Sequence, residues 1–264
     1  MADKAMSSED LADLGYAKSL LENPNLAARI ANVVGLPIEK FIERLPEGAR
    51  EIIRTATTKS LEAALAFATS TMDDRRQGAA NWAHKIVVAA TGAAGGAFGL
   101  PALAIELPVS TIIMLRSIVD IARSEGERIK SPEAKLACLE VFALGGRARS
   151  DDAAGSSYFA VRGVLAKALA EAAEYIVERG VAQETAPPLI RLIAQIAARF
   201  GVPVSEKAMA QSLPIVGAAG GALINTLFID HFQDVGRGHF IVRRLERTYG
   251  PERVRSEYLN IPSG

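Results

Sequence analysis

The sequence predicts an all-α protein, a multi-helix bundle with two central glycine-rich apolar helices. Apolar residues recur at helical spacing along nearly the whole chain, and no segment has the convincing period-two alternation of a strand. Hydrophobic residues make up 49% of the chain but aromatic residues only 6%, so the core is expected to consist mainly of Ala, Leu, Ile and Val. With 264 residues, the chain is long enough to bury such a core.

The first half of the chain predicts a series of amphipathic helices. Ser8 is a good capping residue, and Leu14 and Leu21 share one face of the helix that follows it. The expected helices are 8–23, 25–34, 37–45, 49–71, a charge-free helix over about 80–99 and a longer amphipathic helix over about 107–125. The polar string DDRRQG (73–78) and the Gly-Leu-Pro segment 99–101 are expected to separate them, because glycine and proline interrupt helices.

The second half opens with a strong helix start at 131–132, where a capping serine precedes a proline in the first turn. This helix is expected to end at the two glycines 145–146, and the polar string RARSDDAAGSS (147–157) follows as a linker. The sequence predicts a turn at 203–205 and a break at the glycines of 236–238. The remaining expected helices are about 158–179, 186–200, 205–229 and 237–248, with a short one from Pro251 to Leu259.

The hexapeptide GAAGGA occurs twice, at 92–97 and 217–222, inside the charge-free runs 86–105 and 208–229. Small residues four positions apart let two helix backbones approach closely. Because glycine costs a helix about 1 kcal/mol relative to alanine, a packing role is expected to compensate for it, and Gly221→Leu is expected to overpack the contact. The glycines assigned to helix packing are Gly92, Gly95, Gly96, Gly99, Gly217, Gly220 and Gly221. Two glycine helices packed face to face and an internal duplication both account for the repeat.

Composition and motifs exclude several classes of partner. Lys plus Arg balances Asp plus Glu at 30 each, which argues against nucleic acid. Neither GAAGGA copy has the Lys-Ser/Thr pair of a phosphate-binding loop, and neither follows a predicted strand, so we expect no nucleotide and no cofactor. The single cysteine, Cys138, cannot form an internal disulfide and is expected to be a small buried hydrophobic residue.

The N-terminal sequence is polar and acidic and lacks the apolar segment of a secretory signal. Both charge-free runs reach the roughly 20 residues that span a bilayer. They are rich in Ala and Gly, however, and Pro101 interrupts the first. We therefore expect a cytoplasmic protein, either free or peripherally associated with the inner membrane; a protein with two fixed spans is the alternative.

The string IDHFQDVGRGHF contains most of the candidate polar-site residues, Asp230, His231, Asp234 and His239. On a helix His231 and Asp234 are three residues apart and share a face. Together with Glu246 these groups are the kinds that bind metals or transfer protons. Metal-ligand spacing such as HExxH is absent, so we expect no metal and favour a structural network, with acid–base or metal chemistry as the alternative.

Glu106 lies in the apolar string LPALAIELPV. A buried carboxylate is costly unless it is paired, so we expect a cation beside it, and Arg116 or Arg123 on the following helix are the expected partners. Asp120 is placed to pair with Arg116 within that helix. The favoured interpretation is an ion-pair network that ties the glycine helices to their neighbours. The alternative is a polar pocket that holds the head group of a ligand.

The segment 237–255 is rich in arginine. Cationic side chains near acidic lipid each contribute on the order of 1 kcal/mol to membrane binding. The candidates for contact with a membrane surface are Arg237, Arg243, Arg244 and Arg247. Pairing of Glu246 with Arg243 would leave less free charge, and arginine stems also cover apolar surface.

Several long strings resemble the EcsC protein family, a bacterial family named for a protein encoded beside the subunits of an ABC-type transporter. The similar strings are GAFGLPALAIELPVSTIIMLRSIVDIARSEGE (96–127), LACLEVFALGG (136–146), DDAAGSSYFAVR (151–162) and PIVGAAGGALINTLFIDHFQDVGRGHFIVRRLERTYG (214–250). The resemblance covers about 50–260 and implies no catalytic residue. We expect 1–48 to form an N-terminal helical segment and 49–264 to form an EcsC-like helical domain.

These observations favour a non-catalytic protein that binds a lipid, a membrane surface or a membrane protein. Two other classes remain open. One is an enzyme that uses Glu106, His231, Asp234 and His239 in a polar pocket. The other is a scaffold that forms homo-oligomers through its glycine faces.

Overall fold

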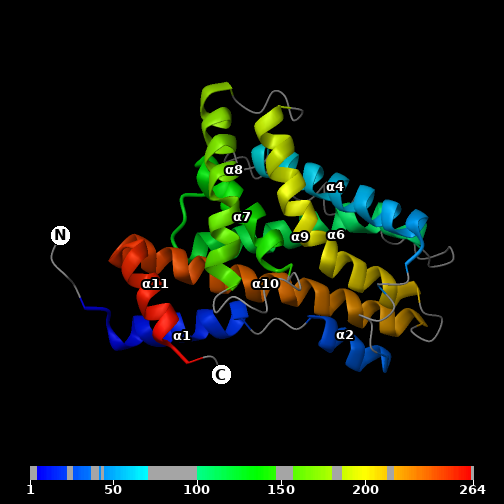
Figure 1. Cartoon of the computed structure of the whole chain (residues 1–264), viewed down its shortest axis with the longest axis horizontal. Helices are drawn as coiled ribbons and strands as arrows, with labels where there is room; N and C mark the ends of the chain where they lie inside the picture. The colour runs from blue at the N-terminus through cyan, green and yellow to red at the C-terminus, as the bar shows by residue number, and fades with distance from the viewer. Residues whose placement is uncertain are drawn as a thin grey trace.

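A computed structural model describes residues 5–22, 26–36, 42, 45–70, 100–146, 157–179, 186–212 and 217–262. Within these residues the chain is a bundle of helices and contains no strand, which confirms the predicted all-α fold (Figure 1). The helices are α1 (Ser8–Glu22), α2 (Leu26–Val34), α4 (Glu47–Ser70), α6 (Leu100–Ser124), α7 (Pro132–Leu144), α8 (Ser157–Arg179), α9 (Pro187–Ser212), α10 (Gly217–Tyr249) and α11 (Pro251–Asn260).

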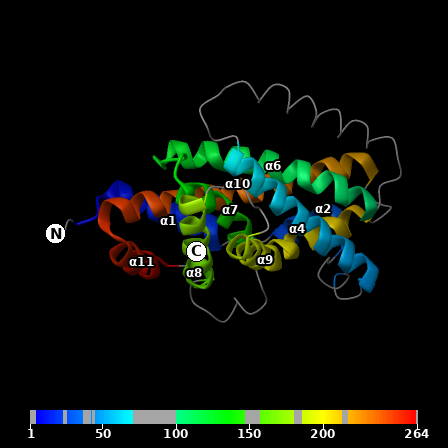
Figure 2. The ribbon, with the colours of Figure 1, turned by 90° about the horizontal axis from the view of Figure 1, so that it is seen from above.

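The long helix α10 is the centre of the bundle, and α1, α2, α6, α7, α9 and α11 all pack against it (Figures 1 and 2). Helix α6 runs beside α10 in the same direction. Gln233 Nε2 donates to Ser117 Oγ at 2.8 Å, and further along both helices Arg244 Nε donates to Glu125 Oε2 at 2.8 Å. Because the two helices are parallel, their N-terminal halves lie at one end of the molecule and their charged C-terminal parts at the other.

The buried face of α10 carries aromatic residues near the middle of the helix. Phe228 and Phe232 pack on Phe200 of α9 and Phe142 of α7, with ring centroids 4.9 to 6.1 Å apart. All four rings are completely buried. A second aromatic cluster, Tyr158, Phe159 and Tyr258, lies between α8 and α11. Ala, Leu, Ile and Val make up most of the rest of the described core, as predicted.

The predicted break at 236–238 is wrong, because α10 continues through both glycines for 33 residues. The glycines are needed for close packing instead. A methyl group on Gly238 would lie 2.8 Å from Leu21 Cγ and 2.9 Å from the carbonyl oxygen of Ala17, so α1 crosses α10 where no side chain intervenes. Gly236 is likewise covered, by Ile118 of α6.

Gly221 is the one GAAGGA glycine whose surroundings lie within the described residues, and no described atom packs against it. Among the described residues, a methyl group on Gly221 would meet no atom within 4 Å. The glycine-rich helix that was expected to pack on it lies outside the described residues, so the overpacking by Gly221→Leu stays a prediction. Gly217 and Gly220 lie in the first turn of α10, but their surroundings are outside what the structure describes. Four further glycines assigned to packing lie outside the described residues: Gly92, Gly95, Gly96 and Gly99.

Two predicted helix starts, those of α7 and α11, occur where they were expected. Ser131 caps α7, its hydroxyl accepting a hydrogen bond from the Ala134 amide at 3.2 Å, and Pro251 opens α11. The start of α1 differs by one residue: Ser7, not Ser8, is the capping residue, and its hydroxyl accepts a hydrogen bond from the Asp10 amide at 3.1 Å. The predicted turn at 203–205 is wrong, because α9 runs through Pro203. Proline cannot donate to the Arg199 carbonyl four residues earlier. A methyl group on Gly146 would lie 2.1 Å from that oxygen, so the α7 C-terminus packs directly on this part of α9.

Helix α6 begins at Leu100, seven residues before the predicted start, and contains Pro108. Glu106 therefore lies within a helix, not before one. The charge-free helix expected over about 80–99 lies outside the described residues, and so do most of the helix expected over 37–45 and most of the linker at 147–157.

The N-terminal segment packs into the same core as the rest of the chain. Lys18 of α1 is buried and donates to the carbonyl oxygens of Tyr258 and Ile261, at 3.0 and 2.6 Å, which fixes the end of α11 to α1. The division of the chain into 1–48 and 49–264 stays a prediction.

Candidate functional site

Glu106 is paired as expected, but with a lysine that sequence reasoning missed. Lys207 Nζ of α9 donates to Glu106 Oε1 at 2.8 Å and to Asn225 Oδ1 of α10 at 2.8 Å. The expected pairing with Arg116 or Arg123 is therefore wrong. The pair links two helices about a hundred residues apart in the sequence, and no local spacing could have indicated it.

Lys207 is the buried member of this pair. Its side chain is 0% exposed, whereas that of Glu106 is 36% exposed. The ammonium group also lies 4.9 Å from the centre of the Phe228 ring, a favourable cation–π position. Burial lowers the pKa of Lys207, and the ion pair with Glu106 opposes that shift. We name these three polar residues, Glu106, Lys207 and Asn225, the α6–α9–α10 polar trio.

The polar trio lies beside an exposed apolar surface. Because Glu106 and Asn225 bind the same ammonium group, the N-terminal halves of α6 and α10 are held together at one end of the bundle (Figure 1). Ile105 is 60% exposed and Leu223 is 47% exposed, and Ala104 and Ala222 are also exposed. We name these four residues, Ala104, Ile105, Ala222 and Leu223, the apolar end.

The other candidates on α6 lie further along that helix and do not join the polar trio. Asp120 accepts a hydrogen bond from Arg123 at 2.7 Å on the exposed surface, so the expected pair with Arg116 is wrong. Arg116 is half-buried, ten residues after Glu106. At about 1.5 Å per residue this is about 15 Å along the helix, too far to share a site with the carboxylate.

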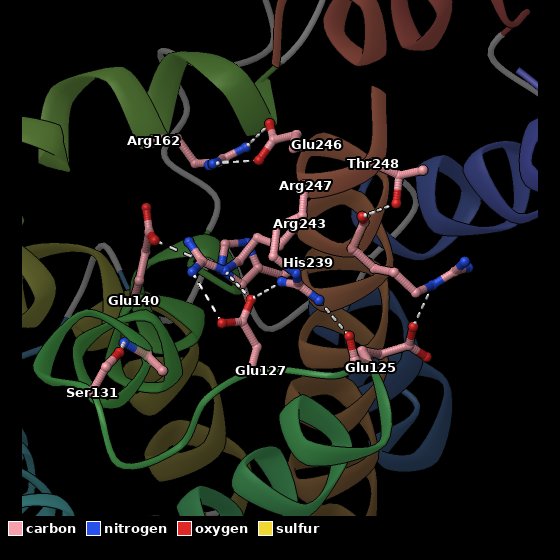
Figure 3. Close-up of polar contacts among 12 residues, drawn as sticks. Glu125, Glu127, Ser131, Glu140, Arg162, His239, Arg243, Glu246, Arg247 and Thr248 are labelled. Atoms are coloured by element: carbon pink, nitrogen blue, oxygen red, sulfur yellow. Dashed lines mark hydrogen bonds and ion pairs between the residues drawn. The ribbon is translucent and has the colours of Figure 1, made fainter. Parts of the chain in front are cut away.

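The arginine-rich segment is paired with carboxylates at the opposite end of α10 (Figure 3). Arg243 and Arg247 both bind Glu127, which precedes α7, and Arg243 Nε lies 2.7 Å from it. Arg244 binds Glu125 and also Asp10 and Asp13 of α1. Burial alone would raise the pKa of Glu127, but its two arginine partners hold it below its usual value.

Glu246 pairs with Arg162 of α8, not with Arg243. The contact is bidentate, at 2.6 and 3.0 Å, and both side chains are largely buried. The positive charge of Arg243, Arg244 and Arg247 is thus matched within the protein, which differs from the expectation of a basic surface. Arg237, the fourth membrane-surface candidate, is exposed.

His239 lies in the same charged region and is completely buried. Its Nδ1 is 3.0 Å from the Tyr158 hydroxyl, and its Nε2 is 3.7 Å from Glu140 Oε2, too far for a hydrogen bond (Figure 3). Burial and the nearby positive charge of Arg162 and Arg243 hold the pKa of His239 well below its usual value. His239 is therefore neutral at physiological pH.

Glu140 is the most unusual acidic group among the described residues. It is buried in α7, and burial raises its pKa to about 7, against the opposing effect of Arg162 and Arg243. Burial also raises the pKa of the neighbouring Tyr158. Glu140, Tyr158 and Arg162 were not selected from the sequence. The available signal was the carboxylate of Glu140 in the otherwise apolar string LACLEVFAL.

The second histidine lies elsewhere. His231 Nε2 is 2.8 Å from the carbonyl oxygen of Gly145, its ring packs on Phe232, and burial lowers its pKa to about 4. Asp230 and Asp234 are only half-buried, and burial raises the pKa of Asp234. Asp230, His231, Asp234 and His239 therefore do not form one polar pocket. Within the part of the chain that the structure describes, no three His, Cys, Asp or Glu residues are grouped as metal ligands.

Cys138 is a buried core residue as predicted, and burial raises the pKa of its thiol to about 12. A thiol of this pKa is not a nucleophile at neutral pH.

The model of the EcsC protein family matches residues 16–245 of this chain. The match begins within α1, further toward the N-terminus than the resemblance indicated. No curated protein and no solved structure matches the chain. None of the helices that the structure describes combines the length and the apolar character needed to cross a membrane.

Proposed function

The chain belongs to the EcsC protein family, and from this premise we propose that it is a non-catalytic protein that attaches peripherally to a membrane surface through its apolar end. The observation that carries the proposal is the exposure of Ile105 and Leu223 on adjacent helices. Single exposed apolar residues are ordinary. Here two neighbouring helices both present them, and the runs 100–105 and 217–229 contain no charged residue.

The mode of attachment follows from where the charges lie. Arg243, Arg244 and Arg247 are engaged with carboxylates at the far end of α10, so they do not offer a basic surface to acidic lipid. Attachment through the apolar end would depend on apolar area removed from water, at about 25 cal/mol per Å². We therefore expect membrane binding that depends little on acidic lipid or on salt.

The buried positions of His231 and His239 favour this proposal over an enzyme. Each imidazole is completely enclosed and has a depressed pKa, and the two contact different elements. Glu106, the third member of the enzyme hypothesis, bonds to Lys207 at the other end of the helix pair. No arrangement for acid–base chemistry joins these groups in the described residues.

A vesicle sedimentation assay tests the proposal. The full chain is mixed with phosphatidylcholine vesicles, with or without phosphatidylglycerol, at 0.1 M and 1 M salt. We expect similar partition in all four conditions. The double variant Ile105→Ser/Leu223→Ser should reduce partition about thirtyfold, because roughly 1 kcal/mol of apolar contact is lost at each of the two positions.

The matched control is Val164→Ser/Ile190→Ser, which removes two exposed apolar side chains from α8 and α9, neither of which carries a residue of the apolar end. The control should bind vesicles as well as the unchanged protein does. Equal loss in both double variants, or no partition of the unchanged protein, would refute the proposal. A dimer that forms without lipid and is lost only in Ile105→Ser/Leu223→Ser would instead favour the scaffold hypothesis.

A further inference from the structure

The two members of the Glu106–Lys207 pair differ in how much of each side chain is exposed to solvent. The Lys207 ammonium group is enclosed by two oxygen acceptors and the Phe228 ring, and none of its side chain is exposed. Glu106 uses Oε1 for Lys207, and its side chain remains 36% exposed. Its second oxygen, Oε2, has no partner among the residues that the structure describes. Only the carboxylate of the pair is therefore accessible from outside the protein.

This carboxylate is placed within the apolar end. Ile105 precedes it directly, and Leu223 lies two residues before Asn225, which shares its lysine. In α6 no charged residue lies between Leu100 and Glu106. The next cation of this helix toward the C-terminus is Arg116, about 15 Å away along the helix. An exposed carboxylate oxygen amid apolar side chains is an acceptor for a cationic hydrogen-bond donor.

We propose that Glu106 is a binding site for the primary ammonium group of a lipid headgroup. This inference rests on the proposed function, since the headgroup reaches Glu106 only when the apolar end contacts the bilayer. A primary ammonium carries three N–H donors and complements the free carboxylate oxygen. A quaternary ammonium carries none, and an anionic headgroup without an amine offers no attractive charge.

The buried lysine gives this site a specific property. The buried Lys207 holds the carboxylate of Glu106 in one position from the interior side. Little side-chain freedom therefore remains to be lost when a ligand binds. An isolated surface glutamate would have to give up that freedom. A fixed acceptor oxygen can make one directed hydrogen bond to an ammonium N–H, whereas a diffuse layer of cations requires no such geometry.

The experiment compares partition into phosphatidylcholine vesicles with partition into vesicles that contain phosphatidylethanolamine at half of the lipid. We expect the full chain to bind the second kind about twofold to fivefold better, the range of an exposed ion pair. Because phosphatidylethanolamine also alters bilayer packing, the measured quantity is the ratio of the two partition coefficients in each variant. Glu106→Gln should reduce this ratio to the value that bilayer packing alone produces, without an ammonium contact.

Two further variants make the result specific. Asp120→Asn removes an exposed carboxylate of the same helix that is held by Arg123, and it should keep the full preference. Glu106→Gln combined with Lys207→Met removes both charges of the pair and avoids an unpaired buried lysine, so it separates loss of the site from loss of folding. It should bind both vesicle types equally.

The outcomes are distinct. A preference that persists in both Glu106 variants, or one that is equally lost in Asp120→Asn, overturns the ammonium site. Equal binding of the unchanged protein to both vesicle types overturns the site and leaves the proposed function standing. No binding to either vesicle type overturns both.

Discussion

Lys207 Nζ lies 2.8 Å from Glu106 Oε1, and each residue borders a charge-free run of the sequence. The run 86–105 ends directly before Glu106, and the run 208–229 begins directly after Lys207. One ion pair therefore joins the end of the first charge-free run to the start of the second. Its position explains why single charges occur at these two places in otherwise apolar surroundings.

The first prediction concerns the asymmetry of this pair. Glu106→Gln leaves the fully buried Lys207 without its counter-charge and should destabilise the fold by on the order of 2 kcal/mol, less than the 3–5 kcal/mol of a fully buried pair because Glu106 contacts water. Lys207→Met leaves a carboxylate that water can solvate and should have a smaller effect. Urea denaturation of both variants measures the difference. A larger loss in Lys207→Met would contradict the assignment of the lysine as the buried member.

The second prediction contrasts two glycines of α10. Gly238→Ala places a methyl group 2.9 Å from the Ala17 carbonyl oxygen and should lower the stability by about 1–3 kcal/mol. Gly221→Ala meets no described atom within 4 Å and should raise it by up to about 1 kcal/mol through helix propensity. Thermal melts compare the two variants under identical conditions. An unchanged or raised melting temperature of Gly238→Ala would mean that α1 does not cross α10 at Gly238, and a lowered one for Gly221→Ala would mean that Gly221 is packed.

The third prediction is a pH dependence from Glu140. Its pKa is about 7 in the folded protein and 4.5 without perturbation, so the folded state binds the proton more tightly than the unfolded state. The contribution of this group to stability is therefore lost as the pH rises from about 4.5 to about 7, and it is constant above that range. The charged and titratable groups that face it are Tyr158, Arg162, His239, Arg243 and Glu246.

Glu140→Gln isolates this effect, because the amide resembles the protonated acid at every pH. Relative to the unchanged protein, the variant should have similar stability near pH 4.5 and should gain up to on the order of 3 kcal/mol by pH 8. Denaturant midpoints at several pH values provide the measurement. A variant that is less stable than the unchanged protein at pH 8 would show that the anionic form of Glu140 is the stabilising one.

The fourth prediction separates structural arginines from exposed ones. Arg243→Gln removes a partner of Glu127, whose side chain is only 6% exposed, and should destabilise the protein by about 2–4 kcal/mol. Arg237→Gln, on an exposed part of the same helix, should change stability by no more than about 0.5 kcal/mol. Neither should alter vesicle binding beyond its effect on folding. Reduced binding by folded Arg243→Gln would restore the basic-surface hypothesis.

Local signals predicted the fold well. The cap at Ser131, the proline that opens α11 and the apolar periodicity of α1 each depend on residues within one or two turns, and each lies where it was predicted. Glycine and proline were less informative. Pro203 and Gly238 lie inside long helices because partners from other helices fit against them: Gly146 lies at the carbonyl that Pro203 leaves without an amide, and α1 crosses at Gly238.

The polar partners could not be predicted from spacing. Glu106 was singled out correctly as a carboxylate that needs a cation, but its partner comes from α9, about a hundred residues away. Arg243 was assigned to the surface from the arginine content of its segment. Its partner Glu127 is 116 residues away in the sequence, so no local spacing indicated the pair. Apolar periodicity indicates which face of a helix is buried, but it does not indicate which helix covers that face.

The uninterrupted course of α10 fixes the length of the chain between its two ends. Asn225 must face Lys207 at one end, while Arg243 must face Glu127 at the other. Inserting or deleting one residue between them would rotate one end by about 100° relative to the other and shift it by about 1.5 Å. One of the two polar contacts would then turn away from its partner. A change in the length of this stretch therefore disrupts one of the two ends, whichever residue is inserted or deleted.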